Sequence, residues 1–187
     1  MGLTRGDTLL VGANRVLTAV GWAAYPLLLA AAVISPAASA ASAASTAAAS
    51  AAAAPHEALP LLAVLVLVPA AGFLICTAIR SAVDAPRPYE QSGAEPLIHK
   101  DTRGKSFPSR HVFSMTTIAL SWLYLGLFWS PALVVGALLL ASSIFMAWVR
   151  VRAGVHYARD VVAGAVLALA VCLVGYALPI LPNLVSP

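Results

Sequence analysis

Five long runs without a charged side chain are the feature that most constrains the fold of this chain. Each is long enough to cross a hydrocarbon layer of ~30 Å as a helix rising ~1.5 Å per residue. Only 10% of the residues are charged, against about a quarter in a soluble domain. The sequence therefore predicts an all-α, multi-span transmembrane helical bundle, forming a single domain over residues 1–187. The five runs are Val16–Ile34, Leu59–Ile79, Val112–Trp129, Pro131–Val149 and Val161–Leu181.

The Ala/Ser-rich segment 35–55 leaves the number of crossings open. As a helix it would have Ser35 as its N-cap, Pro36 in its first turn and Pro55 as its stop. Alanine favours helix, but an Ala/Ser sequence is only weakly hydrophobic. We therefore expect a partly helical loop. The alternative is a sixth span, which would move every later segment to the opposite side of the membrane.

The positive charge is concentrated between the apolar runs. Six of the 11 basic residues lie between positions 80 and 111, and three more lie between 150 and 160. Two short cationic segments beside a membrane suit an anionic lipid headgroup, and they provide too few cations for a nucleic-acid track. We therefore expect membrane lipids as partners and no nucleic acid. The sequence carries no signal for an oligomeric state.

Counting crossings brings the two charged segments together. The second and third runs are joined by the first charged segment, and the fourth and fifth runs by the second. The short turn at Ser130-Pro131 connects the two pairs. Both charged segments therefore emerge on one face of the membrane, whichever way the chain is inserted.

Residues of these segments suit phosphate chemistry. His156 and Asp160 are four apart, so on a helix the carboxylate would lie beside the imidazole and leave its other ring nitrogen free. Arg150 precedes the histidine, and a guanidinium is well suited to binding phosphate oxygens. The first segment adds further arginines and His111.

Three motifs carry a resemblance to a known family. They are Arg80-x6-Arg87-Pro88, Pro108-Ser109-Arg110-His111 and Arg150-x5-His156-x3-Asp160. In order and internal spacing they resemble the signature of the type 2 phosphatidate phosphatase superfamily, which also includes the vanadium haloperoxidases. That signature reads Lys-x6-Arg-Pro, Pro-Ser-Gly-His and Ser-Arg-x5-His-x3-Asp.

This chain departs from the family signature at three positions. Arg80 replaces Lys and keeps the charge, while Val149 replaces Ser and loses a hydroxyl. Arg110 replaces Gly, and it would be strained there if the position required a positive φ. These changes affect details of substrate binding more than the reaction.

The resemblance implies a division of labour at the site. His156 attacks phosphorus and forms a phosphohistidine, Asp160 orients it, and His111 protonates the leaving oxygen and then activates water. The developing charge would be bound by cations and a hydroxyl, without a metal or other cofactor. The expected phosphate-binding residues are Arg80, Arg87, Ser109, Arg110 and Arg150.

The sequence thus indicates a membrane phosphatase acting on a lipid phosphate or diphosphate, such as undecaprenyl diphosphate, phosphatidate or phosphatidylglycerophosphate. The alternative is a membrane protein that binds or transports lipid headgroups without chemistry. Arg5 and Arg15 would place the N-terminus inside, and five spans would then place the site inside too. The resemblance implies the extracytoplasmic face instead.

Overall fold

The chain forms a bundle of helices, and its described part contains no strand. The computed structural model describes residues 4–44, 54–93, 95–98 and 103–177, apart from the side chains of 36–44 and 54–60. The predicted all-α fold is confirmed. In chain order, the helices are α1 (Arg5–Ala44), α2 (Ala54–Val83), α3 (Pro88–Ser92), α4 (Arg110–Leu125), α5 (Pro131–Arg152) and α6 (Ala158–Ala177).

The first helix is much longer than the apolar run that predicted it. It spans 40 residues and continues through Ser35 and Pro36 to Ala44. The reading in which Ser35 caps a separate helix is therefore wrong, because α1 continues through the first part of the Ala/Ser segment. Positions 45–53 of that segment lie outside the described residues.

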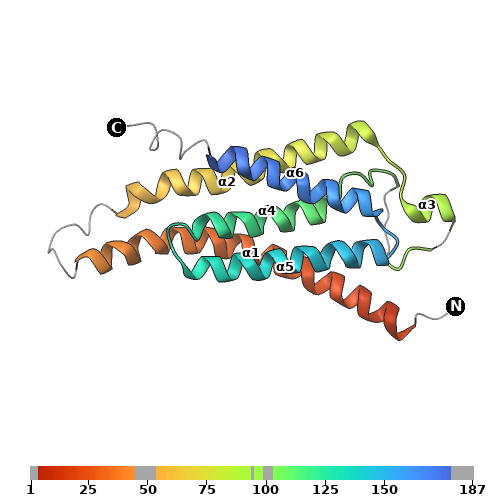
Figure 1. Cartoon of the computed structure of the whole chain (residues 1–187), viewed down its shortest axis with the longest axis horizontal. Coiled ribbons are helices and arrows are strands. Elements are labelled where there is room, and N and C mark those ends of the chain that lie inside the picture. Colours follow the sequence, from red (N-terminus) through yellow and green to blue (C-terminus); the bar gives the residue numbers. More distant parts are fainter. Residues whose placement is uncertain (1–3, 45–53, 94, 99–102, 178–187) are drawn as a thin grey trace.

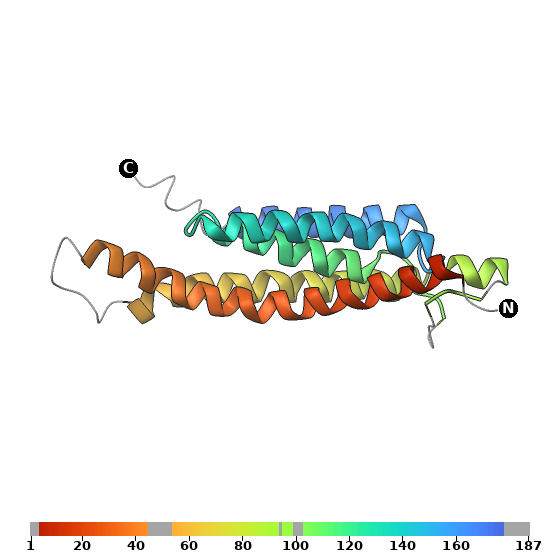
Figure 2. The ribbon, with the colours of Figure 1, turned by 90° about the horizontal axis from the view of Figure 1, so that it is seen from below.

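The long helices form two layers with α4 between them. Figure 2 shows α1 and α2 side by side on one side of the bundle and α5 and α6 on the other. The central helix packs against all four of these helices. Three of its polar residues, Thr116, Thr117 and Ser121, are buried.

The central helix is also shorter than expected. Among the described residues, four helices are long and apolar enough to span a membrane, namely α1, α2, α5 and α6. The third apolar run, Val112–Trp129, also predicted a membrane span, but α4 ends at Leu125 after 16 residues. Its length of about 24 Å is less than the ~30 Å hydrocarbon layer. Because α4 packs against four other helices, it does not have to match the thickness of the hydrocarbon layer.

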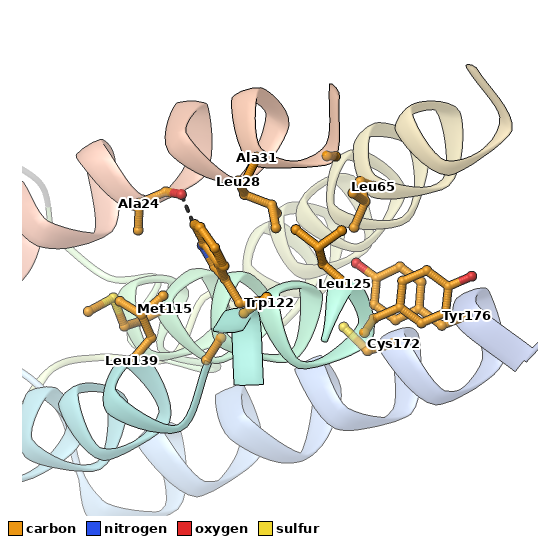
Figure 3. Packing of buried hydrophobic residues seen from close by; sticks show 14 residues of the cluster. Ala24, Leu28, Ala31, Leu65, Met115, Trp122, Leu125, Leu139, Cys172 and Tyr176 are labelled. Carbon is orange, nitrogen blue, oxygen red and sulfur yellow. Dashed lines mark hydrogen bonds between the residues drawn. The ribbon is translucent and has the colours of Figure 1, made fainter. Parts of the chain in front are cut away.

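The apolar core lies between the two layers. Figure 3 shows Trp122 of α4 reaching toward α1, where its indole Nε1–H donates to the carbonyl of Ala24 at 3.1 Å. Leu28 of α1 and Leu65 of α2 are fully buried beside it. A second polar link crosses from α4 to α6, where the Ser121 and Tyr176 hydroxyls are 2.5 Å apart. These contacts fix the position of α4, whose first turn carries part of the candidate site.

Candidate active site

All three sequence motifs meet at one end of the bundle. Figure 1 shows the end of α2, the short α3, the start of α4 and the α5–α6 turn together at this end. Hydrogen bonds connect the segments directly, and two of them involve backbone carbonyls of the α5–α6 region. The Arg87 guanidinium donates to the carbonyl of Val155 at 3.2 Å, and the Ser109 N–H donates to the carbonyl of Asp160 at 2.8 Å. The predicted convergence of the two charged segments is therefore confirmed.

His156 and Asp160 form the buried centre of the site. Their Nδ1 and Oδ2 atoms are 3.6 Å apart, and the two residues are 3% and 0% exposed. The sequence argument placed both on one helix, and this is wrong. The histidine lies in the turn before α6, whereas the aspartate lies in the first turn of α6. The turn between α5 and α6, in which Gly154 has a φ of 69°, brings His156 and Asp160 together without a shared helix.

Asp160 holds several groups of this turn at once. Its Oδ2 accepts from the Ser106 hydroxyl at 2.5 Å and from the Tyr157 N–H at 3.0 Å. The bond to Tyr157 reaches back to the residue before α6, so the carboxylate caps that helix from its third position rather than as the N-cap residue itself. The Ser106 hydroxyl also lies 3.4 Å from His156 Nδ1. The other imidazole nitrogen, Nε2, is the one turned away from the carboxylate.

The surroundings of His156 favour the neutral imidazole. Burial, the largest cause, and the nearby charges of Arg150 and Arg87 lower its pKa from an ordinary 6.5 to about 4. The carboxylate of Asp160 acts in the opposite direction. A neutral imidazole at physiological pH retains the lone pair that a nucleophile needs.

Arg150 is the cation with unused donors. It lies in the last turn of α5 and is 1% exposed, yet its Nε and Nη1 atoms contact no hydrogen-bond acceptor among the described residues. A buried guanidinium is costly unless an anion or acceptor compensates it. Its two free N–H groups therefore suit a bound oxyanion.

Arg80 and Arg87, the two arginines of the first motif, donate to backbone carbonyls. Arg80 Nη1 donates to the carbonyls of Ser106, at 3.5 Å, and Pro108. Arg87 donates from Nε to the carbonyl of Gly104 at 3.0 Å, in addition to its bond to Val155. Both side chains are buried. They fix the loop before α4 against α2 and the α5–α6 turn, which the sequence reading did not anticipate.

Ser109 supplies a second unused polar group. It precedes α4, and its hydroxyl makes no capping bond and contacts no acceptor or donor among the described residues, although it is fully buried. The start of a helix favours anions because its N–H groups are unpaired. Gly164 of α6 permits this arrangement, since a Cβ there would lie 2.6 Å from the Ser109 carbonyl oxygen.

His111 and Arg150 line the same open cavity, of about 410 Å³. His111 is the second residue of α4 and is half-buried. The remaining wall comes largely from α1, through Asn14, Arg15 and Thr18. This contribution from the first helix was missed by sequence reasoning.

Arg110 lies at the rim of the site. Its side chain is exposed, and its guanidinium lies 5.6 Å from the centre of the Phe73 ring. Its charge still acts on that of Arg80. Arg110 is the first residue of α4, and it is not among the described residues with a positive φ. Having arginine where the family signature has glycine therefore causes no backbone strain at this position.

Two further residues of the site had no distinctive sequence signal. Ser106 is fully buried against Asp160, but it lies outside the three motifs. Glu90 accepts from the Gly104 N–H at 2.7 Å and from the Arg87 N–H at 3.2 Å. The bond from the Arg87 N–H to Glu90, in the first turn of α3, is a recognisable helix-start pattern only once α3 is known. Within the described residues, no group of three or more His, Cys, Asp or Glu side chains is placed to hold a metal ion.

Comparisons with known proteins identify the family. The chain is similar in structure to the crystal structure of Aquifex aeolicus LpxE, with a TM-score of 0.62 and 18% identity over 94% of this chain and 87% of the other. It is also similar to the transmembrane PAP2 type phosphatidylglycerolphosphate phosphatase from Bacillus subtilis. That match has a TM-score of 0.56 and 19% identity, covering 92% and 82% of the two chains. The comparison with curated proteins found no match. The sequence model of the PAP2 superfamily matches residues 57–180, which include all three motifs, and the chain therefore belongs to the PAP2 superfamily.

Proposed function

We propose that this chain is an integral membrane phosphatase that hydrolyses a lipid phosphate or diphosphate through a phosphohistidine. The observation that carries the proposal is the pairing of a buried, neutral His156 held by Asp160 with a nearby Arg150 whose Nε and Nη1 donors are unused. Membership of the PAP2 superfamily supports a phosphatase, and the name of the Bacillus subtilis relative, a phosphatidylglycerolphosphate phosphatase, supports a lipid substrate. Apolar helices around the site would keep the lipid chain in the bilayer while its headgroup enters.

In the first step, Nε2 of His156 attacks phosphorus in line with the leaving oxygen. The P–O bond breaks as the N–P bond forms, and His111 gives its proton to the departing oxygen. Asp160, held by the Ser106 hydroxyl and the Tyr157 N–H, stabilises the imidazolium that develops on His156. Arg150 and the hydroxyl of Ser109 bind the phosphoryl oxygens, where negative charge accumulates.

In the second step, water releases the phosphoryl group. His111, now neutral, takes a proton from the water as its oxygen attacks phosphorus. The N–P bond breaks, inorganic phosphate leaves, and His156 returns to its neutral form. Arg80 and Arg87 contribute positive charge while holding the loop that carries Ser109 in place.

The decisive experiment traps the intermediate. Purified protein in detergent micelles is mixed with a lipid carrying a radiolabelled terminal phosphate and quenched within one turnover. We expect a protein-bound label that is labile in acid and stable in alkali, together with phosphate release. His156→Ala should give neither, and vanadate should inhibit by resembling the transition state.

Two outcomes would contradict the proposal. Phosphate release retained by His156→Ala would exclude this histidine as the nucleophile. Lipid binding without any release, across a panel of lipid monophosphates and diphosphates, would instead favour a headgroup-binding or transport protein. Placement of the site on the extracytoplasmic face remains a prediction from the family resemblance, which cysteine labelling at Ser130, on the opposite turn, would test.

A further inference from the structure

The first helix contributes a polar surface to the cavity that the catalytic motifs do not account for. The residues of α1 that line this cavity are Asn14, Arg15, Thr18, Ala19 and Trp22, opposite His111 and Arg150. The family match begins at residue 57 and therefore excludes α1 altogether. This wall therefore lies outside the residues that the family model matches.

Asn14 and Arg15 offer unsatisfied polar groups to a ligand. Asn14 Oδ1 is buried and has no hydrogen-bond partner among the described residues. Arg15 is exposed at the cavity and forms no ion pair within the described part of the chain. Thr18 donates its hydroxyl to the Asn14 carbonyl at 2.7 Å, so its hydrogen is already used. None of the described residues that line the cavity is acidic, which suits it to an anion.

The position of this wall relates it to the leaving group. His111 lines the same cavity and is the residue expected to protonate the leaving oxygen. Whatever is attached to that oxygen must therefore extend into the cavity beside α1. Trp22, which is 79% exposed, lies eight residues beyond Asn14, or ~12 Å further along the helix. The wall thus changes from polar beside the catalytic residues to apolar toward the middle of the bundle.

We infer that Asn14 and Arg15 bind the second phosphate of a lipid diphosphate, so that this chain prefers diphosphate over monophosphate lipids. The inference rests on the proposed phosphatase function. Arg15 would pair with the phosphate that stays on the lipid, while Arg150 binds the phosphoryl group that is transferred. A half-turn of the Asn14 amide exchanges its oxygen and nitrogen and presents N–H donors to the same phosphate.

The reaction balances with this assignment. His156 attacks the terminal phosphorus, the anhydride P–O bond breaks, and the leaving group is the lipid monophosphate. Its oxygen takes the proton of His111, and its charge remains next to Arg15. Water then releases inorganic phosphate from His156. The lipid chain lies along the apolar part of α1, near Trp22.

The test compares two substrates of equal chain length, a polyprenyl diphosphate and the corresponding monophosphate. The measured quantity is the ratio of their kcat/KM values. Arg15→Ala should lower this ratio roughly tenfold, the loss expected for one hydrogen bond between charged groups. Asn14→Asp, which keeps the shape of the side chain but adds a negative charge, should lower the ratio further.

Arg5→Ala is the matched control. Arg5 is an exposed arginine on the same helix that does not line the cavity, so its loss should leave the ratio within about twofold of wild type. Arg15 is exposed as well, and its replacement should not impair folding, which thermal unfolding of each variant would verify.

The possible failures are distinguishable. Wild type that hydrolyses both lipids, with an unchanged ratio in Arg15→Ala and Asn14→Asp, would overturn this inference and leave the phosphatase in place. Wild type that releases phosphate from neither lipid would overturn the proposed function and the inference with it. A drop in the ratio for Arg5→Ala equal to that for Arg15→Ala would reduce the effect to general surface charge and also overturn the inference.

Discussion

Removing the hydroxyl of Ser106 should impair catalysis without removing any residue of the three motifs. Its hydroxyl donates to Asp160 Oδ2 at 2.5 Å and lies 3.4 Å from His156 Nδ1, with the side chain fully buried. In Ser106→Ala, the carboxylate keeps the N–H of Tyr157 at 3.0 Å and its contact with the imidazole. The carboxylate is then free to shift, and the imidazole loses part of its support.

The expected size follows from the charge on the acceptor. A hydrogen bond to a charged group contributes about 1.5–3 kcal/mol, which corresponds to roughly 10- to 100-fold in rate if the bond is needed only in the transition state. Because Asp160 retains another hydrogen bond, we place Ser106→Ala at the lower limit, with kcat reduced about tenfold. KM should change by less than about twofold, since the hydroxyl contacts His156 and Asp160 rather than the phosphate.

Phosphate release from a lipid substrate in micelles would measure this effect. Ser142→Ala is the control, because this serine makes a local bond to the carbonyl of Leu138 on the exposed side of α5. Wild-type kcat in Ser106→Ala would refute the argument that this hydroxyl positions the pair. So would an increase in KM at constant kcat, which would assign Ser106 to substrate binding.

Three further predictions follow from the geometry of the site. Arg150→Lys keeps the charge but loses the planar fork, and it should lower kcat/KM for phosphate release about a hundredfold; activity near wild type would contradict a phosphate role for the unused donors. Protonation removes the His156 lone pair, so the acid limb of kcat/KM should reflect a pKa of about 4 rather than 6.5. Asp160→Asn removes a group that raises this pKa, so the limb should move to lower pH, and an unchanged limb would exclude His156 as its source. Gly164→Ala places a Cβ 2.6 Å from a backbone oxygen and should destabilise the protein by about 1–3 kcal/mol. Gly12→Ala, which meets nothing within 4 Å, is its control in thermal unfolding.

The sequence was sufficient to predict how the site assembles, because that depends on counting crossings. Uncharged runs predict membrane helices, and a short turn at Ser130 requires the two charged segments to share one end. The bonds from Arg87 to Val155 and from Ser109 to Asp160 show that they do. The helical period also suggested the pairing of His156 with Asp160, although the turn before α6 produces that contact in a different way.

Other features depended on packing that no single segment specifies. The length of α4 reflects its place between four other helices, whereas hydropathy predicted a longer span for Val112–Trp129. Ser106 is important only because its loop is folded against α6, and Asn14 only because α1 passes the start of α4. These contacts join residues far apart in the chain, so the local sequence around each residue carries no trace of them.

The different hydrogen bonds of Arg80 and Arg87 explain which of the two arginines can be replaced by lysine. Arg80 reaches both of its carbonyls through one nitrogen, Nη1, and the single ammonium of a lysine has enough donors for the same task. This agrees with the lysine that the family signature has at that position. Arg87 uses two nitrogens, Nε and Nη1, to join carbonyls from two different segments. A lysine cannot bridge that separation from one atom, so the second position of the first motif requires the width of a guanidinium as well as its charge.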